Sequence, residues 1–272
     1  MKRLSAKEFA VLCGPALFAF FLVQRPVWIF AESGGISSTL SAGDIQLADS
    51  SLKKLSPLIE TKKTDGTLAV MTFEELFSPL DEREKAFFEK IQSLQPGAFG
   101  VRTPYLGTES DFSGLVPLEK QPILRQEGIT CLDTQYLPAE VYEAYARMME
   151  AMRKDLGKIL YVESGFRSPA YQLYLFVFYL PRHGYSLEDT AKWNALPGYS
   201  EHGCFARQAL DLINEEGVNG DESVESFELL PEYQWLIRHA SEYGFYLSYP
   251  KGNPAGINFE PWHWHYGKTG SV

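Results

Sequence analysis

The chain contains few cysteines and no cluster of basic residues. Three of its 272 residues are Cys, too few for the dense disulfide framework that holds small secreted domains together. Beyond the N-terminal segment only Cys131 and Cys204 remain, and the sequence leaves open whether they pair. Basic side chains number 25 against 35 acidic ones, a formal net charge of -10. Without a run of Lys or Arg suited to a polyanion, we expect no nucleic-acid partner.

The sequence also lacks an apolar run of the about 20 residues that a full membrane span requires. The N-terminus has a shorter apolar stretch, residues 9–23, preceded by Lys2, Arg3 and Lys7. A basic start followed by a short apolar segment is typical of a secretory signal. We therefore predict that residues 1–31 form a signal peptide. The alternative is an uncleaved signal-anchor that tethers the chain to the membrane through residues 9–23. In both cases the protein is exported, to the periplasm or another extracytoplasmic location.

The composition is that of a folded protein, with 45% hydrophobic and 14% aromatic residues. The N-terminal third beyond the signal shows weak patterns. Residues 32–65 are rich in Ser, Gly, Lys and Asp and indicate a tether or loosely ordered lead-in. Residues 72–94 have a helical pattern interrupted near Pro79, and residues 95–130 read as loop with short strands. We interpret residues 32–130 as a linker and accessory region of unknown role.

Residues 131–272 alternate between clear helix and strand patterns. Predicted helices cover residues 138–157, 169–180 and 231–243, and predicted strands cover residues 159–162, 210–213, 245–248 and 262–266. This order predicts an α+β fold, with a small central antiparallel sheet flanked by helices and an N-terminal accessory region.

Two separate segments carry histidines next to carboxylates. The first contains His202 and Asp211, and the second runs from Glu260 to His265. Because side chains alternate along a strand, His263 and His265 share one face of the second segment. Two imidazoles and a carboxylate, with an open position for water, are typical ligands of a catalytic Zn²⁺. A Glu three residues before a ligand can stand beside the metal and act as a base. The alternative is a pair of histidines that happen to lie among aromatic residues.

Arg167 follows Ser164-Gly165-Phe166 at a predicted turn between a strand and a helix. Taken alone, it reads as a solvated turn residue. Beside a metal site, its guanidinium could hold a carboxylate or polarise a scissile carbonyl. A weaker hypothesis makes Cys204 a nucleophile paired with a histidine.

Three blocks of the chain together resemble a known family. The blocks are Ser164-Gly165-Phe166-Arg167-Ser168 with Tyr171-Gln172, Ser200-Glu201-His202 with Ala209-Leu210-Asp211, and Glu260-Pro261-Trp262-His263. In content, order and separation they resemble the zinc D-alanyl-D-alanine carboxypeptidases of the VanY type, over about residues 137–267. The resemblance implies a compact α+β fold with a central antiparallel sheet. It also implies cleavage of the terminal D-amino acid from peptidoglycan stem peptides.

The resemblance assigns a role to each matching residue at the metal. It implies that zinc is held by His202, Asp211 and His263. Glu260 would be the general base that activates water. His265 falls where relatives often carry Arg or another polar residue, so we place it beside the ligands and not among them.

The substrate-binding residues implied by the resemblance are Arg167, Ser200 and Gln172. Arg167 would hold and polarise the carbonyl region of the substrate. The chain departs from the family pattern between His202 and Asp211, where eight residues intervene instead of six and Arg207 stands in place of a Gly. A longer loop can leave both ligands in place, but it could also mean a remodelled pocket.

We therefore predict that residues 131–272 form a monomeric zinc carboxypeptidase domain that removes the terminal D-amino acid, D-alanine, from peptidoglycan stem peptides. The rival hypotheses are an L,D-carboxypeptidase, a peptidoglycan endopeptidase, and a cell-wall-binding relative without catalytic activity.

Overall fold

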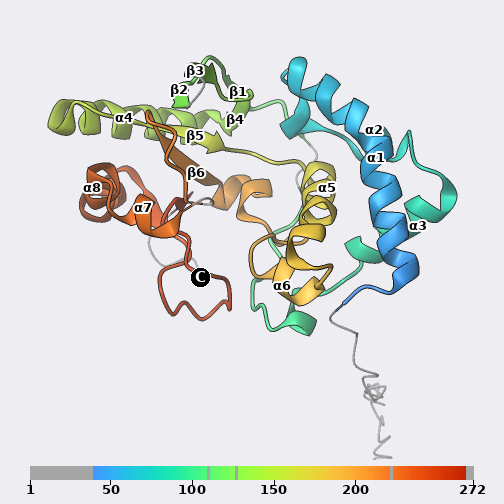
Figure 1. The fold of residues 1–272 in the computed structure, drawn as a ribbon. Helices are drawn as coiled ribbons and strands as arrows, with labels where there is room; N and C mark the ends of the chain where they lie inside the picture. The colour runs from blue at the N-terminus through green and yellow to red at the C-terminus, as the bar shows by residue number, and fades with distance from the viewer. Residues whose placement is uncertain (1–38, 109–110, 126–127, 221–222, 268–272) are drawn as a thin grey trace, which may run out of the picture. The chain divides into compact units, whose positions relative to one another are not determined.

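The computed structural model describes residues 39–108, 111–125, 128–220 and 223–267 (Figure 1). These residues belong to one structural unit, Ser37–Val272. The predicted signal peptide and the possible tether through residues 9–23 lie outside the described ranges. Within those ranges, no helix combines the length and apolar character needed to cross a bilayer.

Helices dominate the N-terminal part of the described chain and recur between the later strands. They are α1 (Ala42–Thr64), α2 (Phe73–Phe77), α3 (Glu82–Gln92), α4 (Ala139–Leu156), α5 (Pro169–Tyr179), α6 (Leu187–Ala191), α7 (Val224–Glu228) and α8 (Pro231–His239). Thr72 and Asp81 each begin a helix with a capping box, in which the carboxylate of a Glu three residues later accepts a hydrogen bond from the backbone N–H of the cap residue. The predicted break near Pro79 is confirmed, because it falls between α2 and α3.

Helix α1 corrects one expectation from the sequence. Residues 42–64 are helical, so the prediction of a loosely ordered lead-in is wrong for this segment. Ser41 caps the helix by accepting a hydrogen bond from the backbone N–H of Asp44. Leu55 and Ile59, one turn apart, are buried against α5 and its neighbours. The polar composition of this segment does not exclude a helix, because most of its Ser and Lys residues lie on the solvent side of α1.

Strands form a four-stranded sheet and two separate antiparallel pairs in the described part of the chain. The pairs are β1 (Leu115–Leu118) with β4 (Gln135–Pro138) and β2 (Pro122–Arg125) with β3 (Gly128–Cys131). The sheet has the order β5-β6-β8-β7, with β5 (Leu160–Ser164), β6 (Ala209–Asn214), β7 (Phe245–Leu247) and β8 (His263–Tyr266). All neighbouring strands in it are antiparallel. The predicted α+β fold with a small antiparallel sheet is confirmed.

The two faces of this sheet differ in chemistry. Leu210, Leu212 and Trp264 point to one face and belong to a hydrophobic core shared with α4 and α8. Because side chains alternate along strands, Asp211 and His263 lie on the opposite face. The sheet therefore has one face for packing and one that is available for a site.

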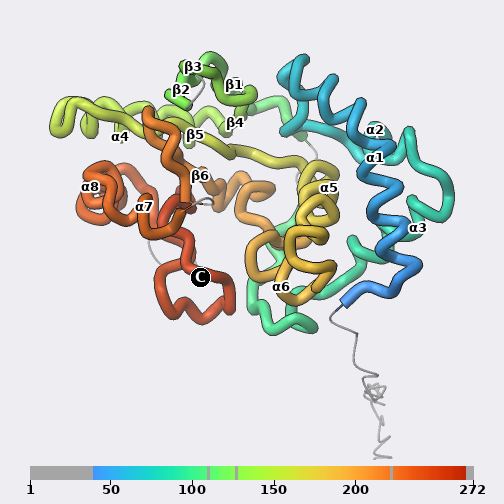
Figure 2. Tube along the Cα trace, in the orientation of Figure 1, coloured from blue at the N-terminus to red at the C-terminus, as the bar shows by residue number. Residues whose placement is uncertain are grey.

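A second hydrophobic core joins the N-terminal helices to the middle of the chain. It contains side chains of α1, α2, α3, α5 and α6. The tube in Figure 2 shows α1 beside α5, two segments far apart in the sequence. The N-terminal accessory helices are thus packed onto the helix that follows Arg167.

Candidate metal centre and surrounding cleft

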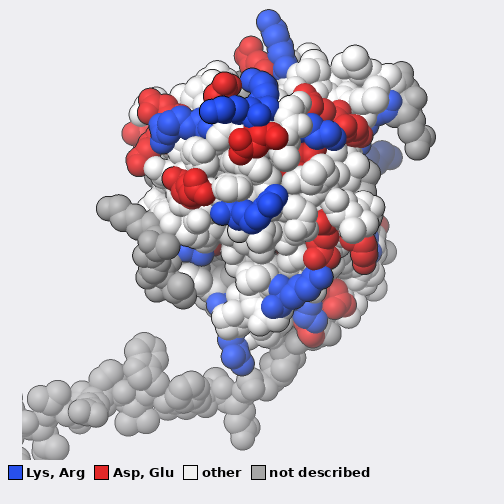
Figure 3. All heavy atoms as spheres, turned by 90° about the vertical axis from the view of Figure 1, so that its left-hand side faces the viewer, with Lys and Arg blue, Asp and Glu red and all other residues white. Residues whose placement is uncertain are grey.

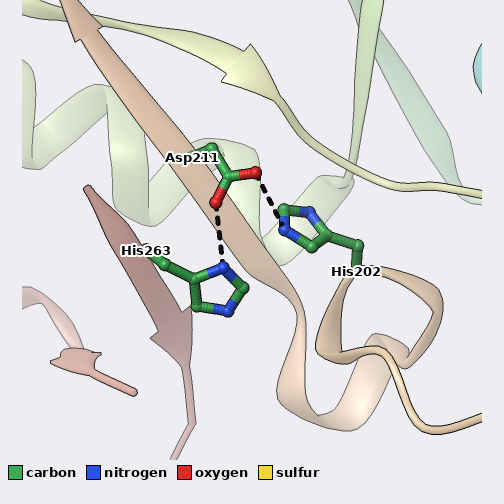
Figure 4. Close-up of side chains that lie close together, drawn as sticks. All are labelled: His202, Asp211 and His263. Atoms are coloured by element: carbon green, nitrogen blue, oxygen red, sulfur yellow. Dashed lines mark hydrogen bonds and ion pairs between the residues drawn. The ribbon is translucent and has the colours of Figure 1, made fainter. Parts of the chain in front are cut away.

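Three side chains that could hold a metal come together on the free face of the sheet (Figure 4). Asp211 of β6 and His263 of β8 are direct partners in the antiparallel ladder. His202 comes from a 3₁₀ turn, Glu201–Gly203, that precedes β6. Nε2 of His202 lies 3.1 Å from Oδ2 of Asp211, and Nδ1 of His263 lies 2.9 Å from Oδ1 of the same carboxylate.

Hydrogen bonds on the far sides of both imidazoles fix which nitrogen faces the metal position. Nδ1–H of His202 donates to the carbonyl of Gly165 at 2.7 Å, so its Nε2 keeps the lone pair. That Nε2 is buried and faces the Asp211 carboxylate. Nε2–H of His263 donates to Glu201 at 2.9 Å, which leaves Nδ1 directed at Asp211. Two imidazole nitrogens and one carboxylate, all within 4.8 Å of one another, fit a catalytic zinc.

The protonation of the three groups follows from burial and from their mutual charges. Burial, and then the positive charge of Arg167, lower the pKa of His202 to about 4, so this imidazole is neutral at neutral pH. Burial also lowers the pKa of His263, but Asp211 and Glu201 outweigh it and raise that pKa to about 10. Burial raises the pKa of Asp211, yet the two histidines hold it well below its usual value. Neutral His202 and ionised Asp211 are already the forms that bind a metal, whereas His263 carries a proton on Nδ1 that a bound ion would displace.

Gly165 explains how the turn before Arg167 reaches the site. A Cβ at this position would stand 2.3 Å from the carbonyl oxygen of Tyr136, a separation that no side chain tolerates. The backbone N–H of Phe166 donates to the same oxygen at 2.7 Å. This close approach places the carbonyl of Gly165 where His202 can donate to it.

Glu260 lies beside the metal position and is buried. Its Oε2 is 3.6 Å from Nδ1 of His263. Its backbone N–H donates to the carbonyl of Tyr249 at 3.1 Å, and the Tyr249 ring packs 4.9 Å from the imidazole of His263. The carboxylate thus faces the same cavity as the three metal-capable side chains.

The residues predicted to bind substrate line this cavity, whose volume is about 1160 Å³. Nη2 of Arg167 is 3.4 Å from Oδ2 of Asp211, and its Nε is buried without a hydrogen-bond partner. Gln172 donates from Nε2 to the carbonyl of Ala195 at 2.7 Å, and its Oε1 has no partner. Ser200 is buried on the cavity wall. The structure therefore brings every predicted site residue into one cleft.

A buried hydrogen-bond network behind His263 was not predicted from the sequence. Glu201 accepts hydrogen bonds from His263, from Oγ of Ser248 and from Nε of Arg207. Oγ of Ser248 also lies 2.8 Å from Nδ1 of His265. Burial raises the pKa of Glu201, but the hydrogen bond and charge of His263 dominate and lower it to about 2. The position of Glu201 next to His202 was a signal for this role, whereas nothing in the sequence pointed to Ser248.

The longer segment between His202 and Asp211 is folded and does not separate the ligands. Residues Phe205–Arg207 form a 3₁₀ turn, and the Phe205 ring packs 5.4 Å from that of Phe166. Arg207, in place of the family's Gly, supplies the ion pair to Glu201. Cys131 and Cys204 are free thiols.

Comparisons with known proteins show the family to which the chain belongs. A sequence model of the VanY family, described as D-alanyl-D-alanine carboxypeptidase, matches residues 134–269. That match is half of the chain, and the chain belongs to this family. The resemblance inferred from the sequence motifs is confirmed.

Individual relatives are more distant. A D-alanyl-D-alanine carboxypeptidase of Enterococcus faecium is 30% identical over 189 residues, which cover 68% of this chain and 55% of the relative. YodJ of Bacillus subtilis (strain 168) is 31% identical over 137 residues, covering 50% and 48%. The solved structure of LdcB, an LD-carboxypeptidase, is 26% identical with a TM-score of 0.47 and covers 64% of this chain and 79% of its own. The chain spans about half the length of the curated relatives it matches (55% and 48%).

Proposed function

We propose that the protein is a zinc-dependent carboxypeptidase that removes the terminal D-amino acid, D-alanine, from peptidoglycan stem peptides. The observation that carries this proposal is the ligand set of His202, Asp211 and His263, with the Glu260 carboxylate in the same cleft. Membership of the VanY family supports the choice of reaction.

The ion would be held by Nε2 of His202, a carboxylate oxygen of Asp211 and Nδ1 of His263. When bound, zinc supplies a Lewis acid that polarises a carbonyl oxygen and lowers the pKa of water. Glu260 stands near enough to take the proton of the attacking water and to return it to the leaving amine. The buried Nε–H of Arg167 is a free donor for the oxyanion that forms on the scissile carbonyl.

Two polar side chains are available to orient the substrate. Oε1 of Gln172 is a buried acceptor without a partner in the structure, suited to a backbone N–H of a bound peptide. The Ser200 hydroxyl is on the same wall and can donate or accept. Unsatisfied buried polar atoms cost free energy, which a correctly placed substrate group would recover.

The proposal also assigns the parts of the chain. Residues 131–272 would form the zinc carboxypeptidase domain, residues 32–130 the accessory region, and residues 1–31 the signal peptide or signal-anchor. A peptidoglycan substrate lies outside the cytoplasm, so the enzyme would act in the periplasm or at another extracytoplasmic location, as a monomer.

The test uses purified protein supplied with zinc and two synthetic stem peptides, a pentapeptide ending in D-Ala-D-Ala and the tetrapeptide that lacks the last residue. Mass spectrometry should find free D-alanine and the tetrapeptide as products of the pentapeptide only. Cleavage of the tetrapeptide would instead assign an L,D-carboxypeptidase, and an internal fragment would assign an endopeptidase. Zinc binding without any cleavage would favour a binding protein.

A further inference from the structure

The cleft extends well beyond the catalytic side chains. The cavity that contains Arg167, His202 and Glu260 continues to α1 and to the C-terminal half of α5. Its distant walls include Ser56, Ile59, Glu60, Lys63, Tyr174 and Phe178. At about 1160 Å³ it is larger than the typical small-molecule pocket of roughly 300–1,000 Å³. Helix α1 lies outside the segment that matches the VanY family, so two regions of the chain build one cleft.

The wall formed by the N-terminal region is anchored directly beside Arg167. Ser168, the next residue, donates from Oγ to the carbonyl of Met71 at 2.6 Å and from its backbone N–H to the carbonyl of Ala69 at 2.8 Å. The Tyr136 hydroxyl donates to the carbonyl of Gly66 at 2.8 Å. These bonds fix the segment after α1 against the turn that carries Arg167. The distant wall therefore keeps a set position relative to the catalytic groups.

An aromatic row on α5 lines the extended part of the cleft. Tyr171, Tyr174 and Phe178 are spaced by three and four residues, so they lie on one face of the helix. Their rings stack in sequence, with centroids 6.3 Å apart for the first pair and 5.7 Å for the second. Phe178, at the outer end, is 48% exposed. A rigid apolar surface thus leads from the catalytic site toward solvent.

Charged groups of both signs border this surface. On α1, Lys63 and Glu60 lie 4.0 Å apart, with side chains 41% and 71% exposed. Arg182, in the turn after α5, lies over the ring of Tyr179. A peptide that bears carboxylates and an amine could form ion pairs with such groups, whereas a neutral glycan could form only hydrogen bonds to them. The chemistry of the wall favours a peptide occupant.

We infer that α1 and the outer part of α5 form an extended subsite that binds the stem peptide upstream of the scissile bond. This inference rests on the proposed carboxypeptidase activity. A carboxypeptidase leaves a single residue downstream of the cut, so a long cleft can be filled only by the upstream chain. The accessory region thereby gains a role, because it supplies the wall that distinguishes long substrates from short ones.

The test compares two substrates that share the same scissile bond, acetyl-D-Ala-D-Ala and the stem pentapeptide. Phe178→Ala and Lys63→Ala should each lower kcat/KM for the pentapeptide about tenfold, mainly through KM, which corresponds to about 1.4 kcal/mol of binding. For the acetylated dipeptide, the same variants should stay within about twofold of the wild type. Tyr142→Ala and Lys53→Ala are matched controls on exposed positions of α4 and α1 and should change neither substrate.

Equal losses on both substrates, or no loss on the pentapeptide, would overturn the subsite. If the two variants lose activity only on stem peptides that are attached to glycan, the peptide subsite is also overturned, and the wall binds glycan instead. Thermal unfolding of each variant checks that the fold is intact, and Lys63→Ala keeps the test valid if Phe178→Ala loosens the aromatic row. If the wild type cleaves neither substrate, the proposed activity has failed. Calorimetric binding of the pentapeptide to the same variants then decides the subsite separately.

Discussion

At the scale of single residues, the metal centre depends on what stands behind each imidazole. A backbone carbonyl, that of Gly165, orients His202, whereas a buried carboxylate, that of Glu201, orients His263. Such partners fix the tautomer and raise the basicity of a ligand. Residue types and spacing pointed to His202 and Asp211, whereas the choice of His263 over His265 came from the resemblance to the VanY family. The partner of His263 did not, because Glu201 is placed by Ser248 and Arg207, and the first of these lies 47 residues away in the chain.

A substitution at Glu260 distinguishes the loss of catalysis from the loss of metal binding. Glu260→Gln should lower kcat at least about 100-fold, since the amide cannot accept the proton of water. Zinc content, measured by atomic emission, should remain at one equivalent, because the three ligands are untouched. Glu228→Gln on α7, where the side chain pairs with Lys251, serves as the control and should retain full activity. Full turnover by the Glu260→Gln variant would contradict the role of Glu260 as general base.

Glu201 should act on metal affinity. Glu201→Ala removes the acceptor for Nε2–H of His263, so we expect the zinc dissociation constant to rise about 10- to 100-fold. Competition with a chromogenic chelator measures this change without reference to catalysis. Glu216→Ala, at an exposed pair with Lys158, should leave the constant unchanged. An unaltered zinc affinity in Glu201→Ala would show that the network does not support the ligand.

At the scale of elements, the sequence predicted most of the catalytic half of the fold. Pro138 and Gly157 flank α4 as expected from their preferences for helix ends, and alternation placed His263 and Trp264 on opposite faces. Helix α1 was missed because its apolar face is narrow and its composition is polar. The apolar face of α1 is buried by its packing on α5. This contact joins segments far apart in the chain, so the local sequence pattern does not reveal it.

The docking of α1 onto α3 should weaken in acid. Burial raises the pKa of Glu84, but hydrogen bonds from Lys54, the Asp81 backbone and Ser50 outweigh burial and hold this pKa below its usual value. A carboxyl group with a depressed folded pKa contributes stability above its unfolded pKa, and this contribution is lost as pH falls through the folded value.

When pH falls from about 6 to about 3, the Glu84→Gln variant should therefore lose less unfolding free energy than the wild type. Urea unfolding at several pH values in that interval measures it, with Glu89→Gln, an exposed position on the same helix, as the control. If Glu84→Gln and the wild type lose equal stability on acidification, the link between Glu84 and docking is wrong.

At the scale of the whole molecule, the main features are the distribution of charge and the meeting of three side chains that could hold a metal. On the face shown in Figure 3, Lys and Arg are interspersed with Asp and Glu and form no continuous basic surface. The chain as a whole carries a formal net charge of -10. Three side chains that could serve as ligands, at positions 202, 211 and 263, come from separate segments and meet at one point. A metal at that point would link β6, β8 and the turn before them.

Metal removal should consequently lower the stability of the folded protein. A ligand that binds only the native state adds about 4 kcal/mol when its free concentration is about 1,000 times its dissociation constant. Scanning calorimetry should find a lower unfolding temperature after dialysis against a chelator, and zinc should restore it. The same experiment on His202→Ala should show no effect of zinc. An unchanged unfolding temperature in the wild type would contradict a metal shared by these segments.

The central claim is that one zinc ion in this ligand set makes the protein a D-alanine-releasing carboxypeptidase. The most direct measurement is a titration of metal-free protein with zinc, in which D-alanine released from the stem pentapeptide is followed at each addition. We expect a rate that rises linearly and reaches its plateau at one equivalent of zinc. Full release by the metal-free protein in the presence of chelator, or no release at any zinc level, would contradict it.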